Sequence, residues 1–257
     1  MIFTPPSPAA SANPAAWLAS RITRGSDWVT STVGTGYRAY ARLFHPLDDG
    51  PDAPRWADLA ARHGRIMHPS AQWEHISSTV APADTMSRSR GFPGEPHIGN
   101  LHPEALASLC TLLRDHTATS EDCWFAVWDG WGWQHPGAHA ILQATRTGEP
   151  TTPINDAPES KRLNLAAPKF CLSDRDYCLF HGPVDAATRI GDWVTADWFD
   201  PQSPSLFWPA DRAWCVATEI DFDSTLIGGT PDLIAAVTSS AHLEALPIAP
   251  YQDLINI

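Results

Sequence analysis

Five consecutive residues, Asp221-Phe222-Asp223-Ser224-Thr225, combine side chains and a spacing that can do chemistry. Two aspartates separated by one residue at the end of an apolar strand can act as a nucleophile and a general acid/base beside a Mg²⁺ ion. The strand that would carry them is predicted over residues 214–221. This segment is rich in β-formers and alternates between apolar and polar residues at its C-terminal end.

The same DxDxT spacing occurs in the haloacid dehalogenase phosphatases, where the remaining catalytic Lys and acidic residues follow downstream of the motif. Only 32 residues follow Thr225 in this chain, and none of them is Lys or Arg. We therefore interpret Asp221 and Asp223 as acids that cap a turn at the end of a strand. A metal-dependent phosphatase is the weakest of three hypotheses.

Other catalytic and ligand-binding signatures are absent from the sequence. It contains no GxSxG, no P-loop and no GxGxxG, which removes the usual signals of α/β-hydrolases, P-loop NTPases and Rossmann domains. The eleven His residues form no HExxH or other compact ligand pattern, and the five Cys residues form no CxxC pair. The sequence thus predicts no catalytic residue, no metal site and no cofactor. An odd number of Cys residues in apolar runs indicates buried thiols in a reducing compartment.

The candidate binding chemistry that remains is aromatic. Trp residues gather on two predicted hairpins, one turning at Asp129-Gly130 and the other at residues 209–212. A wall of Trp rings with an Asp at its tip can bind a ligand or a partner, although we expect most of these rings in the core. We interpret Arg212 as a structural ion-pair partner. The candidate binding residues are Trp128, Asp129, Trp131, Trp133, Trp208, Asp211, Arg212, Asp221 and Asp223.

Acidic residues are concentrated in the C-terminal third of the chain. The formal net charge is −12, and residues 171–257 hold 13 acidic and three basic side chains against 16 acidic and 14 basic before them. Such a field repels nucleic acid and anionic membranes and attracts a basic partner. No apolar run approaches the roughly 20 residues of a membrane span, and the N-terminus has no basic signal region, so we expect a cytoplasmic protein.

Strand and helix signals are mixed along the chain without a regular βαβ alternation. The patterns predict strands over residues 37–44, 123–128, 176–183, 206–208, 214–221 and 243–248, and helices over 55–63, 103–116 and after Thr230. These signals indicate an α+β fold with a largely antiparallel central sheet built from hairpins and helices packed on one side. We expect a mobile segment over residues 1–15 and a single α+β domain over 16–257, with 145–168 as a linker or long loop.

The segments CWFAVWDGWGW and SPSLFWPADRAWCVATEIDFDSTLIGG resemble a family of uncharacterised proteins from high-GC Gram-positive bacteria. The resemblance covers the chain from about Gly36 to Leu246. That family has no established activity, so the resemblance implies relatives and no mechanism.

Two hypotheses of different classes follow. The first is a non-catalytic recognition protein, for example an immunity-type or toxin-neutralising protein that binds a basic protein through its acidic C-terminal third. The second is an enzyme or small-ligand binder in which Asp129, Asp211, Asp221 and Asp223 converge in a Trp-lined pocket. The sequence leaves the oligomeric state open.

Overall fold

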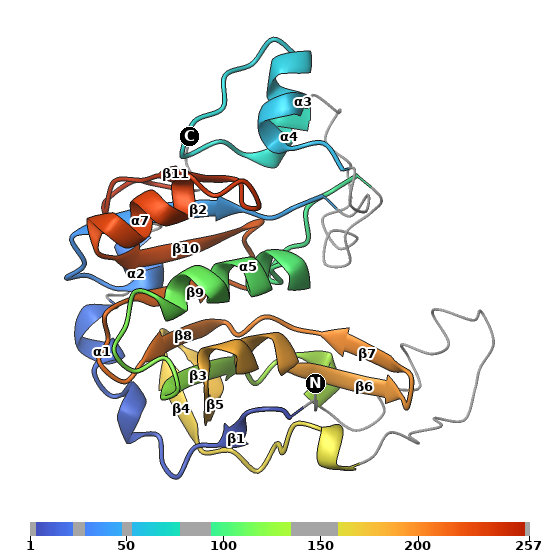
Figure 1. Ribbon diagram of the computed structural model, residues 1–257, viewed down its shortest axis with the longest axis vertical. Coiled ribbons are helices and arrows are strands. Elements are labelled where there is room, and N and C mark those ends of the chain that lie inside the picture. The colour runs from blue at the N-terminus through green and yellow to red at the C-terminus, as the bar shows by residue number, and fades with distance from the viewer. Residues whose placement is uncertain (1–3, 23–28, 48–52, 78–93, 135–158, 255–257) are drawn as a thin grey trace.

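An antiparallel sheet forms the centre of the computed structural model, which describes residues 4–22, 29–47, 53–77, 94–134 and 159–254 (Figure 1). In these residues the strand order is β1-β5-β3-β8-β9-β10-β2-β11, and β4 pairs with β5 beside this path. The strands are β1 (Ser7–Pro8), β2 (Ala39–Phe44), β3 (Cys123–Trp128), β4 (Lys169–Leu172), β5 (Arg175–Gly182), β8 (Leu206–Pro209), β9 (Cys215–Thr218), β10 (Ser224–Gly229) and β11 (Ala245–Pro247). The predicted α+β class and the largely antiparallel sheet are confirmed.

The strands β8, β9 and β10 form a continuous meander in the middle of the sheet. Antiparallel pairing of β8 with β9 aligns Leu206 with Ala217, which confirms the hairpin predicted at residues 209–212. Pairing of β9 with β10 aligns Thr218 with Thr225. The helix α7 (Pro231–Thr238) follows β10 directly, and the Thr230 hydroxyl accepts a hydrogen bond from the Leu233 N–H at 3.2 Å. Thr230 is therefore the N-cap that the sequence predicts.

Strands from both sides of residues 135–158 belong to the same sheet. β3 pairs with β5 along its whole length, from Cys123 opposite Gly182 to Trp128 opposite Tyr177. Residues 145–158 of the predicted linker lie outside the described residues. The chain after them runs through a short 3-10 turn, η4 (Glu159–Lys161), and Ala167 is buried before β4 begins. The segment between β3 and β4 thus connects neighbouring parts of one sheet.

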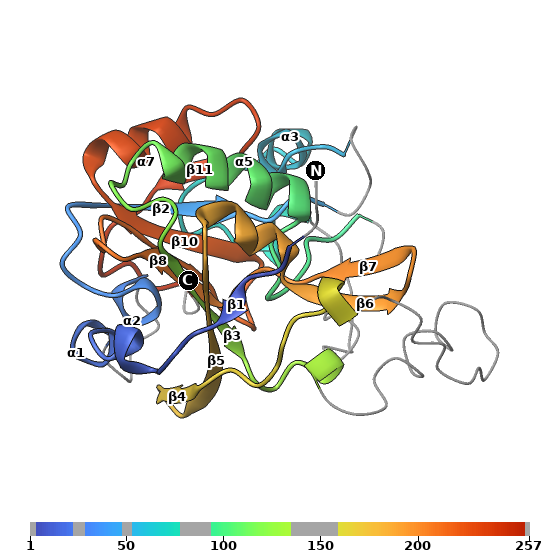
Figure 2. The ribbon, with the colours of Figure 1, turned by 60° about the horizontal axis from the view of Figure 1, so that its bottom comes forward.

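Helices cover both faces of the sheet, which corrects the expectation that they pack on one side (Figure 2). One face carries α5 (Pro103–Arg114) and α7, and the other carries α1 (Leu18–Arg21) and α2 (Val29–Val33). The central strands have apolar side chains in both directions. Ile227 lies in the core beneath α5 and α7, whereas its neighbour Leu226 lies in the core beneath α1 and α2. Because successive strand residues point to opposite faces, such a strand needs cover on both.

The N-terminal segment is part of the sheet where the structure describes it. Ser7 and Pro8 pair with His181 and Phe180 of β5, and the Ala9 N–H donates to the Leu179 carbonyl at 2.9 Å. These backbone hydrogen bonds place residues 7–9 at the edge of the sheet, within the segment that the sequence predicts to be mobile. Composition alone misses them because Pro-rich sequence is compatible with a short edge strand.

Two smaller units flank the sheet. The helices α3 (Trp56–Arg62) and α4 (Trp73–Ser77) pack with Phe44 in a separate core cluster, and α3 confirms the predicted helix. The strands β6 (Gly191–Thr195) and β7 (Trp198–Pro201) form a two-stranded ribbon off the main sheet. Within the described ranges, no helix has the length and apolar character to cross a bilayer.

Candidate functional site

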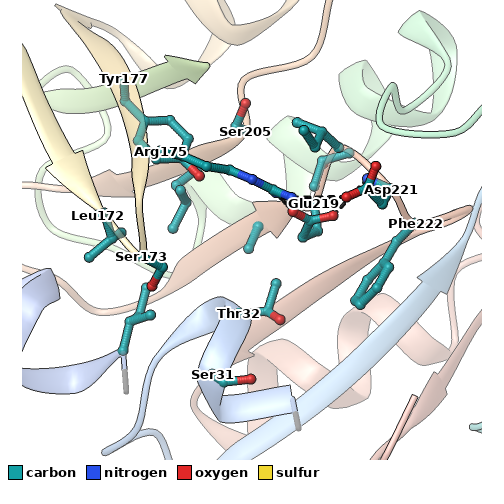
Figure 3. Close-up of a pocket in the computed structure, with 15 residues that line it drawn as sticks. Ser31, Thr32, Leu172, Ser173, Arg175, Tyr177, Ser205, Glu219, Asp221 and Phe222 are labelled. Carbon is teal, nitrogen blue, oxygen red and sulfur yellow. Dashed lines mark hydrogen bonds and ion pairs between the residues drawn. The ribbon is translucent and has the colours of Figure 1, made fainter. Parts of the chain in front are cut away.

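A cavity of about 310 Å³ opens on the sheet face that carries α1 and α2 (Figure 3). Its polar lining comes from α2, from the β4–β5 hairpin, from the residue before β8, from the end of β9 and from the β9–β10 turn. The hydroxyl groups belong to Ser31, Thr32, Ser173, Tyr177, Ser205 and Thr218, and the charged groups to Arg175, Glu219 and Asp221. A volume near the lower limit of small-molecule sites and a mixed polar and apolar lining make this cavity the leading candidate site.

Arg175 bridges one side of the cavity. Its guanidinium forms an ion pair with Glu219 and a 2.9 Å contact with the Asp221 carboxylate (Figure 3). Because β3 and β8 lie between β5 and β9 in the sheet, this side chain spans the ends of two strands. The Asp221 side chain is 70% exposed and that of Glu219 is 20% exposed. Two carboxylates that hold a guanidinium at a cavity mouth form a cation-binding arrangement.

The turn that carries Arg175 adopts an unusual backbone conformation. Ser173 and Asp174, the two residues between β4 and β5, have φ values of 50° and 65°. A two-residue hairpin turn with positive φ at both positions matches the right-handed twist of its strands, but residues other than Gly and Asn adopt it at a cost. Local strain of this kind persists where surrounding contacts hold it, and it is common at functional sites.

A buried chain of hydrogen bonds leads away from the cavity. The carbonyl of His97 can only accept, so the Nδ1–H of His45 donates to it at 2.6 Å, and His45 Nε2 accepts from the Thr225 hydroxyl at 2.9 Å. Thr225 in turn contacts the hydroxyl of Thr218, a cavity residue, at 2.8 Å. Burial lowers the pKa of His45 from 6.5 to about 3, so the imidazole is neutral and a poor general base at neutral pH. The chain therefore orders the strand ends rather than activating a nucleophile.

A second cavity, of about 480 Å³, lies across the β9–β10 turn. Trp73 and Glu95 contribute to its walls, and Asp221 and Phe222 line both cavities. The turn is thus a ridge between two hollows, and Asp221 is exposed on it.

Asp223 lies behind this ridge and forms a buried ion pair. Arg42, whose side chain is 3% exposed, contacts the Asp223 carboxylate at 3.0 Å and also donates to Ser224 and to the carbonyl of Ala71. Burial raises the pKa of Asp223, and the Arg42 charge and a backbone hydrogen bond from Trp73 oppose that shift. Asp223, which the sequence predicts as a binding residue, lines the second cavity, and its charge is compensated there by Arg42.

The first predicted Trp hairpin does not form. After Asp129-Gly130 the chain enters a 3-10 turn, η3 (Gly132–Gln134), and β3 pairs with β5 and β8 instead. Trp131 and Trp133 pack against the core beneath α5 and Trp128 packs against the opposite core, while the Trp128 and Trp131 rings contact each other edge-on at 5.5 Å. The Asp129 carboxylate accepts from the Lys169 ammonium at 2.8 Å.

The second group of predicted residues lies at the other end of β8 and β9. Trp208 is 1% exposed and packs edge-on against Trp17, which removes it from any surface. The Asp211 carboxylate accepts from the Ala118 N–H and the Ala213 N–H, and these bonds lower its pKa against the effect of burial. Arg212 lies over the Trp17 ring at 5.2 Å, so its described contact is a cation–π contact rather than the expected ion pair.

The four aspartates of the pocket hypothesis thus do not converge. Of the four, Asp221 lines the first cavity, Asp221 and Asp223 both line the second, and Asp129 and Asp211 are engaged elsewhere. Sequence reasoning missed Glu219 and Arg175. The available signal was that Arg175 is one of three bases in an acidic third and that Glu219 lies two residues before Asp221.

No group of three or more metal-ligating side chains occurs among the residues that the structure describes. No protein-family model matches the chain, and no curated protein or solved structure matches it. The resemblance to uncharacterised proteins of high-GC Gram-positive bacteria stays a prediction, and the functional argument rests on the cavity.

Proposed function

We propose that the protein is a non-catalytic recognition protein that binds a cationic side chain of a basic protein partner at Glu219 and Asp221. The observation that supports this proposal is that both carboxylates stand at the mouth of a cavity and already hold a guanidinium, that of Arg175. A partner's Arg or Lys offers the same chemistry. Charge-assisted bonds to carboxylates are about twice as strong as neutral ones.

Several other carboxylates of the acidic third are engaged within the molecule. Asp185 pairs with Arg114, and Asp223 pairs with Arg42. Glu244 accepts the N–H groups of Trp56 and Ala57 at the start of α3. The proposal therefore narrows the binding surface from the whole acidic third to the cavity mouth.

An immunity-type or toxin-neutralising protein that acts in the cytoplasm is the concrete form of this proposal. Such proteins need fast and specific association, which opposite charges on the two surfaces provide. Exposed charges are screened by salt, so binding to the basic partner should weaken as ionic strength rises.

A peptide titration tests the proposed site. We expect tetra-arginine to bind the wild-type protein in calorimetry and to bind the Glu219→Gln/Asp221→Asn variant about tenfold more weakly or worse, because two charge-assisted contacts are lost. The variant Asp197→Asn/Asp232→Asn is the matched control, since it removes the same charge from two exposed positions. Equal weakening in both variants would show that only net charge matters and would refute the site.

The second candidate function is small-ligand binding inside the cavity, and the six hydroxyl groups in its lining favour it. Thr32→Tyr distinguishes the two, because a larger side chain on α2 fills the cavity and leaves Glu219 and Asp221 unchanged. For a small-ligand binder, this variant abolishes thermal stabilisation by metabolites. For a basic-partner binder, tetra-arginine affinity changes by less than about threefold.

A further inference from the structure

Two arginines share one indole ring at the end of β8 and β9 that lies opposite the candidate cavity. The guanidinium carbons of Arg21 and Arg212 lie 5.6 and 5.2 Å from the centre of the Trp17 ring. Arg21 comes from α1, and Arg212 comes from the tip of the β8–β9 hairpin, where its φ of 56° is unusual for a residue other than Gly. Segments far apart in the sequence thus place two positive charges around one indole ring.

These charges are not balanced by a described carboxylate. Within the described residues neither arginine forms an ion pair, although the chain has a net charge of −12. The neighbouring carboxylate of Asp211 is engaged by Thr117 and Ala118. Arg21 donates to the Thr35 carbonyl at 3.2 Å, and Arg212 is exposed. A pair of guanidinium groups without a carboxylate is the arrangement that recognises an anion.

Two buried polar atoms beside these arginines lack hydrogen-bond partners in the described part of the chain. They are Nε1 of Trp17, a residue that is 8% exposed, and the hydroxyl oxygen of Tyr37. Arg21 also faces the Tyr37 ring at 5.9 Å. Burial raises the pKa of the Tyr37 hydroxyl, and the charges of Arg21 and Arg212 oppose this shift. A buried donor without an acceptor is costly, so each of these atoms calls for an explanation.

We propose that Arg21, Arg212, Trp17 and Tyr37 form a binding site for a phosphate group. Phosphate carries the charge that two guanidinium groups complement and accepts their paired N–H donors. Its remaining oxygens accept hydrogen bonds from Trp17 Nε1–H and the Tyr37 hydroxyl. Both of these atoms are covered, so the anion enters where Arg212, exposed and stacked on Trp17, moves aside. Free phosphate and a small phosphomonoester share this chemistry.

The phosphate site is independent of the proposed function. It lies at the Pro209 and Cys215 ends of β8 and β9, whereas the cavity lies at the Leu206 and Thr218 ends. Loss of either site therefore leaves the other intact, and the two proposals fail separately.

Nuclear magnetic resonance of the indole N–H groups tests the phosphate site directly. The Trp17 resonance is assigned with Trp17→Phe and followed while inorganic phosphate or glycerol 3-phosphate replaces chloride at constant ionic strength. We expect a saturable shift of this resonance. Tighter binding of inorganic phosphate identifies the free anion as the ligand, and tighter binding of glycerol 3-phosphate identifies a phosphomonoester. No saturable shift with either ligand overturns the proposal.

Variants separate anion binding from a structural role. Arg212→Asn removes the charge while suiting the positive φ, so the protein stays folded and phosphate binding weakens about tenfold or more. Tyr37→Phe weakens it several-fold through loss of one donor. Arg38→Ala, which removes an exposed arginine beside Tyr37, is the matched control and leaves the affinity unchanged. Equal phosphate affinity in Arg212→Asn and the wild type contradicts the proposal, because stacking on Trp17 would then be the only role of Arg212.

Discussion

Single residues at the candidate cavity owe their roles to burial that the sequence does not display. His45 precedes a proline, a pattern typical of the end of a strand, yet its side chain is fully buried between the His97 carbonyl and Thr225. Asp223 and Asp221 are two residues apart, but one is buried against Arg42 and the other is exposed on the turn. Residue type and spacing predict the interactions that a side chain is able to form. Which of these interactions it forms depends on partners that can lie more than 180 positions away, as Asp223 does from Arg42.

The buried His45 predicts acid sensitivity. Its pKa is about 3 in the folded protein and 6.5 as an unperturbed group, so only the unfolded chain gains its proton as pH falls below 6.5. The free energy of unfolding should therefore fall by about 1.4 kcal/mol per pH unit from this residue. The charge of Arg42 also opposes protonation of the imidazole, whereas the hydrogen bond to the His97 carbonyl favours it.

Urea denaturation of the wild type and of His45→Gln between pH 7 and pH 4 measures this effect. The raised pKa values of Asp223 and Glu244 act in the opposite direction, but they are present in both proteins. We expect a shallower loss of stability with falling pH in His45→Gln. Parallel curves for the two proteins would mean that His45 protonates equally well in the folded state.

The buried ion pair predicts a large effect of Arg42→Met. This substitution leaves the Asp223 charge buried without its partner and removes the donors to Ser224 and to the Ala71 carbonyl. Breaking one side of a buried pair costs about 3–5 kcal/mol of unfolding free energy. Urea denaturation provides the measurement, with Arg65→Met at an exposed arginine as the control. A loss below about 1 kcal/mol would contradict the assigned role.

At the scale of elements, the sequence predicts the helices and strands whose formation depends on residues close together in the chain. The α5 and α7 helices, the β8–β9 hairpin and the β2, β3, β5 and β11 strands follow from periodicity, caps and turn residues. The pairing of β3 with β5 instead of residues 131–133 could not be predicted in this way, because the strands are separated by more than 45 residues. The sequence also does not predict that helices cover both faces of the sheet, since the short helices α1 and α2 give weak periodicity signals.

The β4–β5 hairpin predicts a stabilising substitution. Ser173→Asn/Asp174→Gly replaces two residues at positive φ with the pair that this turn type favours. Relief of the backbone strain should raise the free energy of unfolding by about 1 kcal/mol, which chemical denaturation measures. Ser239→Asn, at an α7 C-cap with a φ of −95°, is the control. A fall in stability would mean that the Ser173 and Asp174 side chains contribute more than the strain costs.

At the scale of the whole molecule, not all of the acidic residues in the C-terminal third are available to a partner. Asp185, Asp223 and Glu244 form contacts with the N-terminal two thirds of the chain. These contacts connect the two parts of the sequence, so these three carboxylates contribute to the packing of the fold. Net charge predicts the sign of a partner's charge, and the two carboxylates at the cavity mouth support our proposal of where such a partner binds.

The measurement that tests the central claim most directly is the affinity of Arg175→Gln for tetra-arginine. In the wild type, Arg175 occupies Glu219 and Asp221, so its removal frees both carboxylates for the peptide. We predict binding about threefold to tenfold tighter than in Arg189→Gln, which makes the same change in net charge elsewhere in the acidic third. Equal affinities in the two variants, or weaker binding by Arg175→Gln, would contradict the account of this cavity as a cation-recognition site.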